Sequence, residues 1–222
     1  MAPWTHFRAT KPYDVLVAAP LIALYALGIA VRLAPDTLAD IRALPAPMAW
    51  LHVLRDLANL GYVTLIVGLI LFRRMPVAKS DFLPRAVALT SAYLYLARIA
   101  LPHANISPIV DTLAAALTTI GTAAAIVVLF WLRRSFSILP EARVLVTTGP
   151  YRIVRHPLYV TEEIANFGVM LQFAQPWSLL IEIVNVGLQL WRISFEERVL
   201  LSAFPGYADY ASRTRRLIPG IY

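Results

Sequence analysis

Long apolar runs constrain this chain more than any other feature of its sequence. A helix needs about 20 apolar residues to cross the hydrocarbon core of a bilayer, which is about 30 Å thick. Runs near that length follow one another along the chain, over residues 14–33, 48–72, 82–101, 109–132, 157–173 and 176–201. The first is longer than the core of a signal peptide, so we expect an uncleaved span. The pattern predicts an all-α integral membrane bundle with about five to six transmembrane helices.

The turn between the last two runs is Ala174-Gln175-Pro176, and its proline begins the last run. A connection this short predicts the tip of a helical hairpin. The arms of the hairpin contain charged residues, namely Glu162, Glu163, Glu182 and Arg192. The pattern leaves open whether both arms span the membrane or are partly sheltered by the other helices.

Composition supports a membrane protein and excludes several other classes. Apolar residues make up 59% of the chain and charged residues 15%, whereas a soluble domain is about 25% charged. The chain contains no cysteine, which excludes disulfides, thiolate zinc sites and a cysteine nucleophile. The net charge of +7 would suggest nucleic acid in a soluble protein. Here the basic residues lie between apolar runs, so we expect no nucleic-acid partner.

The positions of lysine and arginine predict how the chain is oriented. Cytoplasmic loops of membrane proteins carry an excess of these residues. They gather in the loop after the second run, in the long loop after the fourth and in the tail: Arg73, Arg74, Lys79, Arg133, Arg134, Arg143, Arg152, Arg155, Arg213, Arg215 and Arg216. We therefore expect both termini on the cytoplasmic side of a bacterial inner membrane.

Polar residues are unevenly distributed along this single predicted membrane domain, residues 1–222. Residues 1–132 are mostly apolar and predict four transmembrane helices. Residues 133–222 collect Arg, His, Tyr, Glu, Gly and Pro, and they include the hairpin and the basic tail. Because chemistry needs polar groups, we expect the functional site in residues 133–222.

The most informative stretch is GPYRIVRHPLY, residues 149–159. Proline fits the first turn of a helix and disfavours a helical conformation in the residue before it. Arg155 and His156 should therefore lie just before a helix N-terminus, where free backbone N–H groups attract anions. A basic turn at the membrane surface, anchored by Tyr151 and Tyr159, explains the same pattern, and the spacing leaves both interpretations open.

A second feature is the segment Arg192-Ile193-Ser194-Phe195-Glu196-Glu197-Arg198. Arg192 and Glu196 are four residues apart and can share a helix face. Adjacent helical residues point about 100° apart, so at most one of the two glutamates should line the same pocket as Arg192. The alternative is that the helix leaves the membrane here and Glu196–Arg198 are solvated, which spacing alone slightly favours.

Other polar groups have structural explanations. The tail, residues 204–219, predicts a turn, a short amphipathic helix and a basic patch that either closes over a site or binds anionic lipid. Arg55 and Asp56 fit a buried pair, a substrate contact or a position near the interface. We expect Arg98 and Asp111 to reach out toward the membrane surface. No pair of histidines has the spacing of metal ligands, so we expect no metal site.

Taken together, these elements resemble a known family. The order is GPYxxxRHPxY, a helical hairpin, an adjacent Glu pair and a tyrosine-containing basic tail that ends in Leu-Ile-Pro. This order is similar to that of the isoprenylcysteine carboxyl methyltransferase family and its phospholipid methyltransferase relatives. The resemblance covers roughly residues 133–220. Where many relatives have a small residue soon after the tyrosine, often glycine in the second position, this chain has Val160-Thr161.

The resemblance implies an integral membrane enzyme that uses S-adenosyl-L-methionine in a cytoplasmic pocket, without a Rossmann domain. It implies cofactor-binding roles for Gly149, Tyr151, Arg155, His156, Pro157, Tyr159, Glu196 and Glu197. Catalytic roles in holding or activating the acceptor are expected for Arg192, Glu196 and Arg198. The acceptor would be a lipophilic small molecule or lipid from the bilayer, either a prenylcysteine-like or isoprenoid carboxylate or a lipid head group.

Two other functions compete with this hypothesis. Membrane reductases related to the sterol reductases resemble the same C-terminal region and would bind NADPH, although they are usually larger. A non-catalytic membrane scaffold or transporter would bind no methyl donor and would tolerate loss of His156 and Glu196.

Overall fold

The computed structural model describes residues 34–222 except 45, 73 and 75, together with residues 19 and 23. The first predicted span, residues 14–33, lies outside the described residues apart from these two positions. The predicted side of the N-terminus lies outside them as well.

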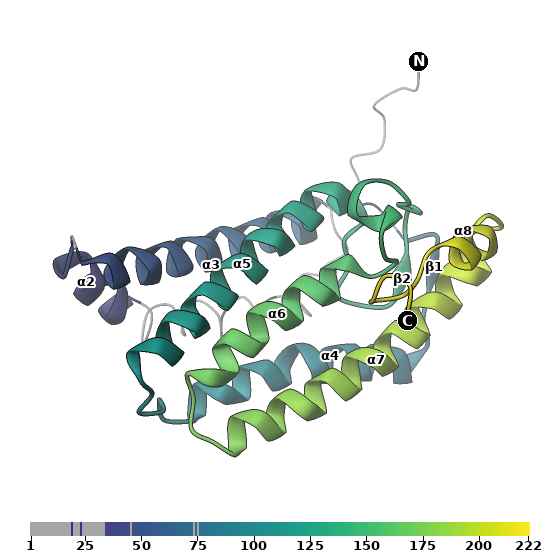
Figure 1. Cartoon of the computed structure of the whole chain (residues 1–222). Coiled ribbons are helices and arrows are strands. Elements are labelled where there is room, and N and C mark those ends of the chain that lie inside the picture. Colours follow the sequence, from purple (N-terminus) through teal and green to yellow (C-terminus); the bar gives the residue numbers. More distant parts are fainter. Residues whose placement is uncertain (1–18, 20–22, 24–33, 45, 73, 75) are drawn as a thin grey trace.

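The described residues fold mainly into helices, arranged as an elongated bundle (Figure 1). The α-helices are α2 (Ala34–Arg42), α3 (Pro47–Phe72), α4 (Phe82–Leu94), α5 (Pro108–Leu132), α6 (Pro157–Leu171), α7 (Trp177–Ala203) and α8 (Tyr207–Arg213). The 3-10 helices are η2 (Tyr95–Ala100), η3 (Arg133–Ser135) and η4 (Gly149–Arg152). Two short strands, β1 (Ala78–Lys79) and β2 (Glu141–Ala142), depart from the all-helical prediction.

The five predicted runs within the described residues are confirmed as helical to within a few residues. The third is split, because the chain tightens from α4 into η2 after Leu94. The segment before α3 forms α2, which was predicted only as a loop. Proline begins three of the helices: Pro47, Pro108 and Pro157 stand at the starts of α3, α5 and α6. Proline has no N–H to lose at a helix start, so this placement costs no hydrogen bond.

Among the described residues, three helices are long and apolar enough to cross a membrane, namely α3, α5 (continued into η3) and α7. Helix α6 has 15 residues, which at the α-helical rise gives about 22 Å, short of a bilayer core. The predicted number of spans therefore stays a prediction.

Glycines let α5 and α6 approach closely. A Cβ at Gly121 would lie 2.4 Å from the Ala165 nitrogen, and a Cβ at Gly168 would lie 2.5 Å from Thr118 Oγ1. Small residues at membrane helix interfaces allow backbones to pack in this way. This packing fixes α6, and with it the residues at the start of α6, against the rest of the bundle.

The three basic segments gather at one end of the bundle, together with α8 and the two strands (Figure 1). The Arg74 N–H donates to the Arg134 carbonyl at 2.9 Å, and β1 pairs antiparallel with β2. Val154 forms a parallel bridge with Arg215. We call this the tail end (residues 74, 76–81, 133–156 and 204–222). The opposite α2 end comprises α2 and residues 101–107 and 172–176. The basic segments thus share one end, and the membrane side that they face stays a prediction.

Two expectations about charged residues are resolved within the bundle. Arg98 does not reach the membrane surface: it is 2% exposed and pairs with Glu182 of α7. Because η2 packs against α7, this charge is neutralised inside the protein rather than at the interface. Asp56 is 3% exposed and accepts from Arg55 Nε at 2.8 Å, so the buried-pair interpretation of Arg55 and Asp56 is confirmed.

Candidate functional site

A cavity of about 850 Å³ lies between the helices, within the range of about 300–1,000 Å³ typical of small-molecule sites. At the tail end its lining includes Tyr151, His156 and Glu196, and at the α2 end it includes Asp40 and His52. We call it the central cavity. It extends from one end of the bundle to the other.

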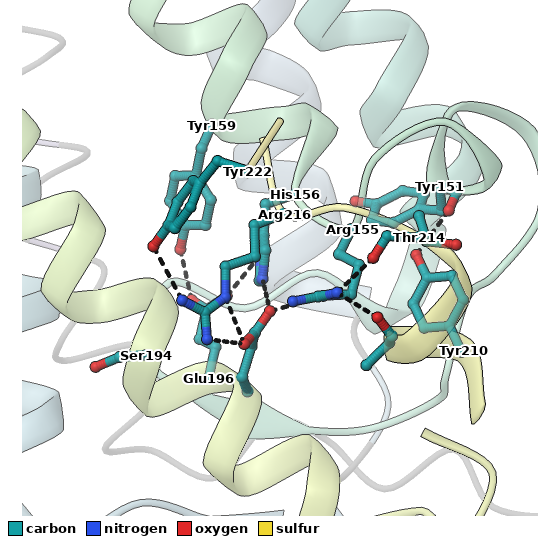
Figure 2. A network of polar contacts seen from close by, with 12 residues as sticks. Tyr151, Arg155, His156, Tyr159, Ser194, Glu196, Tyr210, Thr214, Arg216 and Tyr222 are labelled. Carbon is teal, nitrogen blue, oxygen red and sulfur yellow. Dashed lines mark hydrogen bonds and ion pairs between the residues drawn. The ribbon is translucent and has the colours of Figure 1, made fainter. Parts of the chain in front are cut away.

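Glu197 is the hub of a buried network at the tail end. Figure 2 shows three of its basic members, Arg155, His156 and Arg216, converging from the loop before α6 and from the tail. Glu197 Oε1 accepts from Arg155 Nε at 2.8 Å and lies 3.3 Å from His156 Nε2. Its Oε2 accepts from Arg216 Nε at 2.8 Å. Glu197 is only 6% exposed, so the solvated interpretation is wrong for this residue. A buried carboxylate is tolerated here because three basic side chains surround it.

Main-chain hydrogen bonds fasten the tail to the loop before α6. The N–H groups of Arg155 and His156 donate to the carbonyls of Arg215 and Arg216 at 2.7 and 3.0 Å. Arg155 Nη1 also donates to the carbonyls of Ala211, at 2.8 Å, and Thr214. Most donors of Arg155 are therefore used inside the protein. Hydrogen bonds to Tyr222 and Glu197 raise the pKa of Arg216.

Two tyrosines, one from α8 and one from η4, add a hydrogen bond beside this network. The Tyr210 hydroxyl donates to the Tyr151 carbonyl at 2.6 Å (Figure 2). Burial raises the pKa of Tyr210 to about 12 and raises that of Tyr151 further. Both phenols stay neutral at physiological pH.

Glu196 belongs to a second group, which lines the central cavity. Its Oε1 accepts from the Tyr159 hydroxyl at 2.5 Å and from Arg192 Nε at 3.1 Å. The Arg192 guanidinium lies 5.2 Å from the centre of the Tyr159 ring. His156 lies between the two glutamates, with Nδ1 3.9 Å from Glu196 Oε2. The expectation that only one of the two glutamates shares a pocket with Arg192 is confirmed.

Four predicted site residues do not line the central cavity: Glu197, described above, and Gly149, Pro157 and Arg198. Gly149 has a positive φ of 61°, and a Cβ there would lie 2.5 Å from the Trp131 ring, so its need for glycine has a packing explanation. Pro157 begins α6, as predicted. Arg198 is exposed, with its guanidinium 5.3 Å from the centre of the Phe195 ring. The geometry does not bring Arg198 to Arg192 or Glu196.

Other lining residues were not predicted. Glu162, one of the charged residues of the predicted hairpin arms, accepts from the Tyr62 hydroxyl of α3 and lines the cavity. Tyr207 is 1% exposed and also lines it. Gln189 lines it from α7. The polar spacing along α7, at residues 182, 185, 189, 192 and 196, is a sequence signal that could have identified Gln189.

This arrangement suits a ligand that carries both charge and aromatic surface. Carboxylates accept hydrogen bonds from hydroxyls or ammonium groups. Tyrosine faces attract cations. A guanidinium beside the same space can hold an anion. The fold and this cavity define a helical membrane protein with a buried polar site at its tail end.

Comparison with known families places the segment that builds this site. Residues 110–206 match the phospholipid methyltransferase family, the family of membrane methyltransferases similar to the isoprenylcysteine carboxyl methyltransferases. The resemblance predicted from the sequence motifs is confirmed over this segment, which runs from α5 to the start of the tail. The matched segment includes most of α5 and all of α6 and α7, and with them the residues around Glu196 and Glu197.

The chain is also similar to the cobalt-zinc-cadmium resistance protein CzcN of Cupriavidus metallidurans. The two are 39% identical over 79 residues, which make up 34% of this chain and 35% of that protein. The chain thus matches about a third of the length of this curated relative.

Proposed function

We propose that the protein is an integral membrane methyltransferase that uses S-adenosyl-L-methionine and methylates a lipophilic acceptor from the bilayer. The acceptor is a prenylcysteine-like or isoprenoid carboxylate, or a lipid head group. One observation carries the proposal: His156 and Tyr159 of the RHPxY motif meet Glu196 and Glu197 beside the central cavity. These residues are 37 to 41 apart in sequence, so their convergence is a property of the fold.

The residues present fit such a cofactor. The Tyr207 hydroxyl is buried and has no hydrogen-bond partner in the part of the chain that the structure describes. It supplies a donor for a ribose or carboxylate oxygen. Tyr151 and Tyr159 offer aromatic faces to a sulfonium or an adenine. Glu196 accepts from an ammonium or a ribose hydroxyl, and the backbone at the start of α6 suits a carboxylate.

When bound, S-adenosyl-L-methionine supplies a methyl group whose bond to sulfur breaks as the bond to the acceptor forms, and the sulfur keeps the electron pair. The protein's part is alignment and the exclusion of water. The guanidinium of Arg192 binds the oxygen atoms of the acceptor. A carboxylate acceptor needs no base, whereas a hydroxyl or an ammonium must lose a proton. Glu196 and Glu162, which line the cavity, are placed to accept that proton.

Titration of the purified protein in detergent with S-adenosylhomocysteine, by calorimetry, tests this proposal. NADPH serves as the control ligand. We expect saturable binding of the nucleoside and none of NADPH. Binding of NADPH alone would favour a reductase. Binding of neither, to protein shown to be folded, would contradict an enzymatic role.

A further inference from the structure

Helix α7 carries a polar stripe through an otherwise apolar segment. Its members recur every three or four residues, so they share one face of the helix: Glu182, Asn185, Gln189, Arg192 and Glu196. Each of them is buried or partly buried. Four of the five have protein partners through hydrogen bonds or ion pairs. Gln189 is the exception.

The side chain of Gln189 is buried without a partner for its amide oxygen. The residue is 8% exposed, and its Oε1 has no hydrogen-bond partner among the residues that the structure describes. Burying a polar group in this way costs free energy unless a partner compensates. An amide offers one acceptor and two donors, so it can pair with a hydroxyl or carboxylate from a ligand.

Gln189 also lies where two cavities meet. A smaller cavity of about 410 Å³ lies between α6 and α7, and both Gln189 and Tyr159 line it as well as the central cavity. We call it the lateral groove. Its floor is buried, with Ile193 1% exposed. Its rim is exposed and apolar: Ile164, Phe167, Val186 and Leu190.

The lateral groove is suited to bind a lipid chain. Val186 and Leu190 of this rim belong to α7, which is long and apolar enough to cross a membrane, and hydrocarbon would surround them there. The floor ends at Tyr159, which bonds to Glu196 and lies under Arg192. A chain lying in the groove would therefore deliver its polar end to Gln189 and Arg192 in the central cavity.

We propose that Gln189 selects the acceptor: its amide hydrogen-bonds the oxygen-bearing head of a single-chain amphiphile whose apolar chain lies in the lateral groove. The inference rests on the proposed function, since it concerns the acceptor of that same site. It makes Gln189 a specificity-determining residue, whereas a merely structural glutamine would not distinguish one head group from another.

Photolabelling of the full chain in lipid nanodiscs tests this role. The probes are hexadecan-1-ol, hexadecanoic acid and hexadecane, each with a diazirine at mid-chain, and labelled peptides are mapped by mass spectrometry. We expect the alcohol or the acid to label the groove peptides of α6 and α7 roughly three- to tenfold more than the alkane does, which is the range that one hydrogen bond supplies. Whichever of these two probes labels the groove more strongly identifies the preferred head group.

Variants of α7 separate the contributions of head and chain. Gln189→Leu should abolish the advantage of the head-bearing probe, and Gln189→Met provides a second apolar side chain. Gln189→Glu should keep a hydrogen bond to the alcohol. Val186→Trp fills the groove and should reduce labelling by every probe. Ile183→Trp is the matched control, because Ile183 is 58% exposed on the same helix and lines neither cavity.

Equal labelling by all three probes, or an advantage that survives in both apolar variants of Gln189, overturns the proposal. Binding of S-adenosylhomocysteine is measured on the same samples and reports on the proposed function separately. Normal nucleoside binding without head selectivity overturns the role of Gln189 alone. Head-selective labelling that depends on Gln189, in a protein that binds no nucleoside, would support the lipid site and contradict the methyltransferase.

Discussion

The two ends of the central cavity both carry ionisable side chains, but they are built differently. At the α2 end His52 lies between two aspartates, with Nδ1 3.3 Å from Asp40 Oδ1 and Nε2 3.1 Å from Asp111 Oδ2. These pairs join one helix to another. At the tail end three segments far apart in sequence converge on the adjacent Glu196 and Glu197, and main-chain hydrogen bonds and tyrosines reinforce the contact.

This difference indicates a structural role for the α2 end and a functional role for the tail end. At the α2 end the pairs of His52 with Asp40 and Asp111 join α3 to α2 and α5, so these side chains are already occupied with one another. The tail end instead combines carboxylates, an imidazole, guanidiniums and aromatic faces around one end of a cavity. Asp40 and His52 also lie outside the segment that matches the phospholipid methyltransferase family. We therefore expect the chemistry at the tail end.

The largest effect is expected from Glu197→Gln. This change leaves Arg155 and His156, both largely buried, without their carboxylate partner. Breaking a buried ion pair costs about 3 kcal/mol or more, so the thermal midpoint in detergent should fall sharply. A midpoint like that of the wild type would show that the Glu197 network is not what holds the tail.

Glu196→Gln should affect the ligand more than the fold. The amide can still accept from Tyr159, but the charge facing the cavity is lost. We expect the affinity for S-adenosylhomocysteine to fall about tenfold, as for a lost charge-assisted hydrogen bond. Calorimetry measures the affinity and thermal unfolding the stability. A large loss of stability at unchanged affinity would reverse the division between the two glutamates.

His52→Ala probes the α2 end. Its ion pairs are partly exposed, so we expect a loss of about 1 kcal/mol in stability. The affinity for the nucleoside should stay within about twofold of the wild type, a change well below that of one lost hydrogen bond to a charge. If this affinity falls as far as in Glu196→Gln, the comparison of the two ends fails.

Tyr210→Phe removes the hydrogen bond to the Tyr151 carbonyl and should cost about 1 kcal/mol at neutral pH. Burial raises the pKa of Tyr210 to about 12, above that of about 10 in an unfolded chain. The stabilisation is therefore complete below about pH 10 and is lost as pH rises through the folded pKa. The difference in thermal midpoint between the two proteins should shrink between about pH 10 and pH 12. A constant difference would contradict this role of the phenol.

The smallest effect is expected from Arg198→Ala. The side chain is exposed and contacts only the Phe195 ring among the interactions described above. Stability should change by less than about 0.5 kcal/mol, and nucleoside affinity should not change. A loss of nucleoside affinity in this variant would show that Arg198 contributes to the site.

Sequence patterns predicted the helices well because apolar runs and prolines act locally. Pro157 marked the start of α6, and the spacing of Arg192 and Glu196 predicted their shared face. The family resemblance assigned His156 and Glu197 to one cofactor pocket but did not predict their direct contact, since no local rule connects residues 41 apart. The contacts Arg98–Glu182 and Tyr62–Glu162 were missed because they depend on which helix faces which. The unpaired amide of Gln189 was missed because pairing can be judged only in the packed structure.

The central claim is that the tail end, and not the α2 end, receives the cofactor. Hydrogen–deuterium exchange of the full chain, with and without S-adenosylhomocysteine, tests it most directly. We predict slower exchange in peptides that cover residues 149–159 and 192–217, and unchanged exchange over residues 37–56. Protection confined to residues 37–56, or protection nowhere in protein that binds the nucleoside, would contradict the claim.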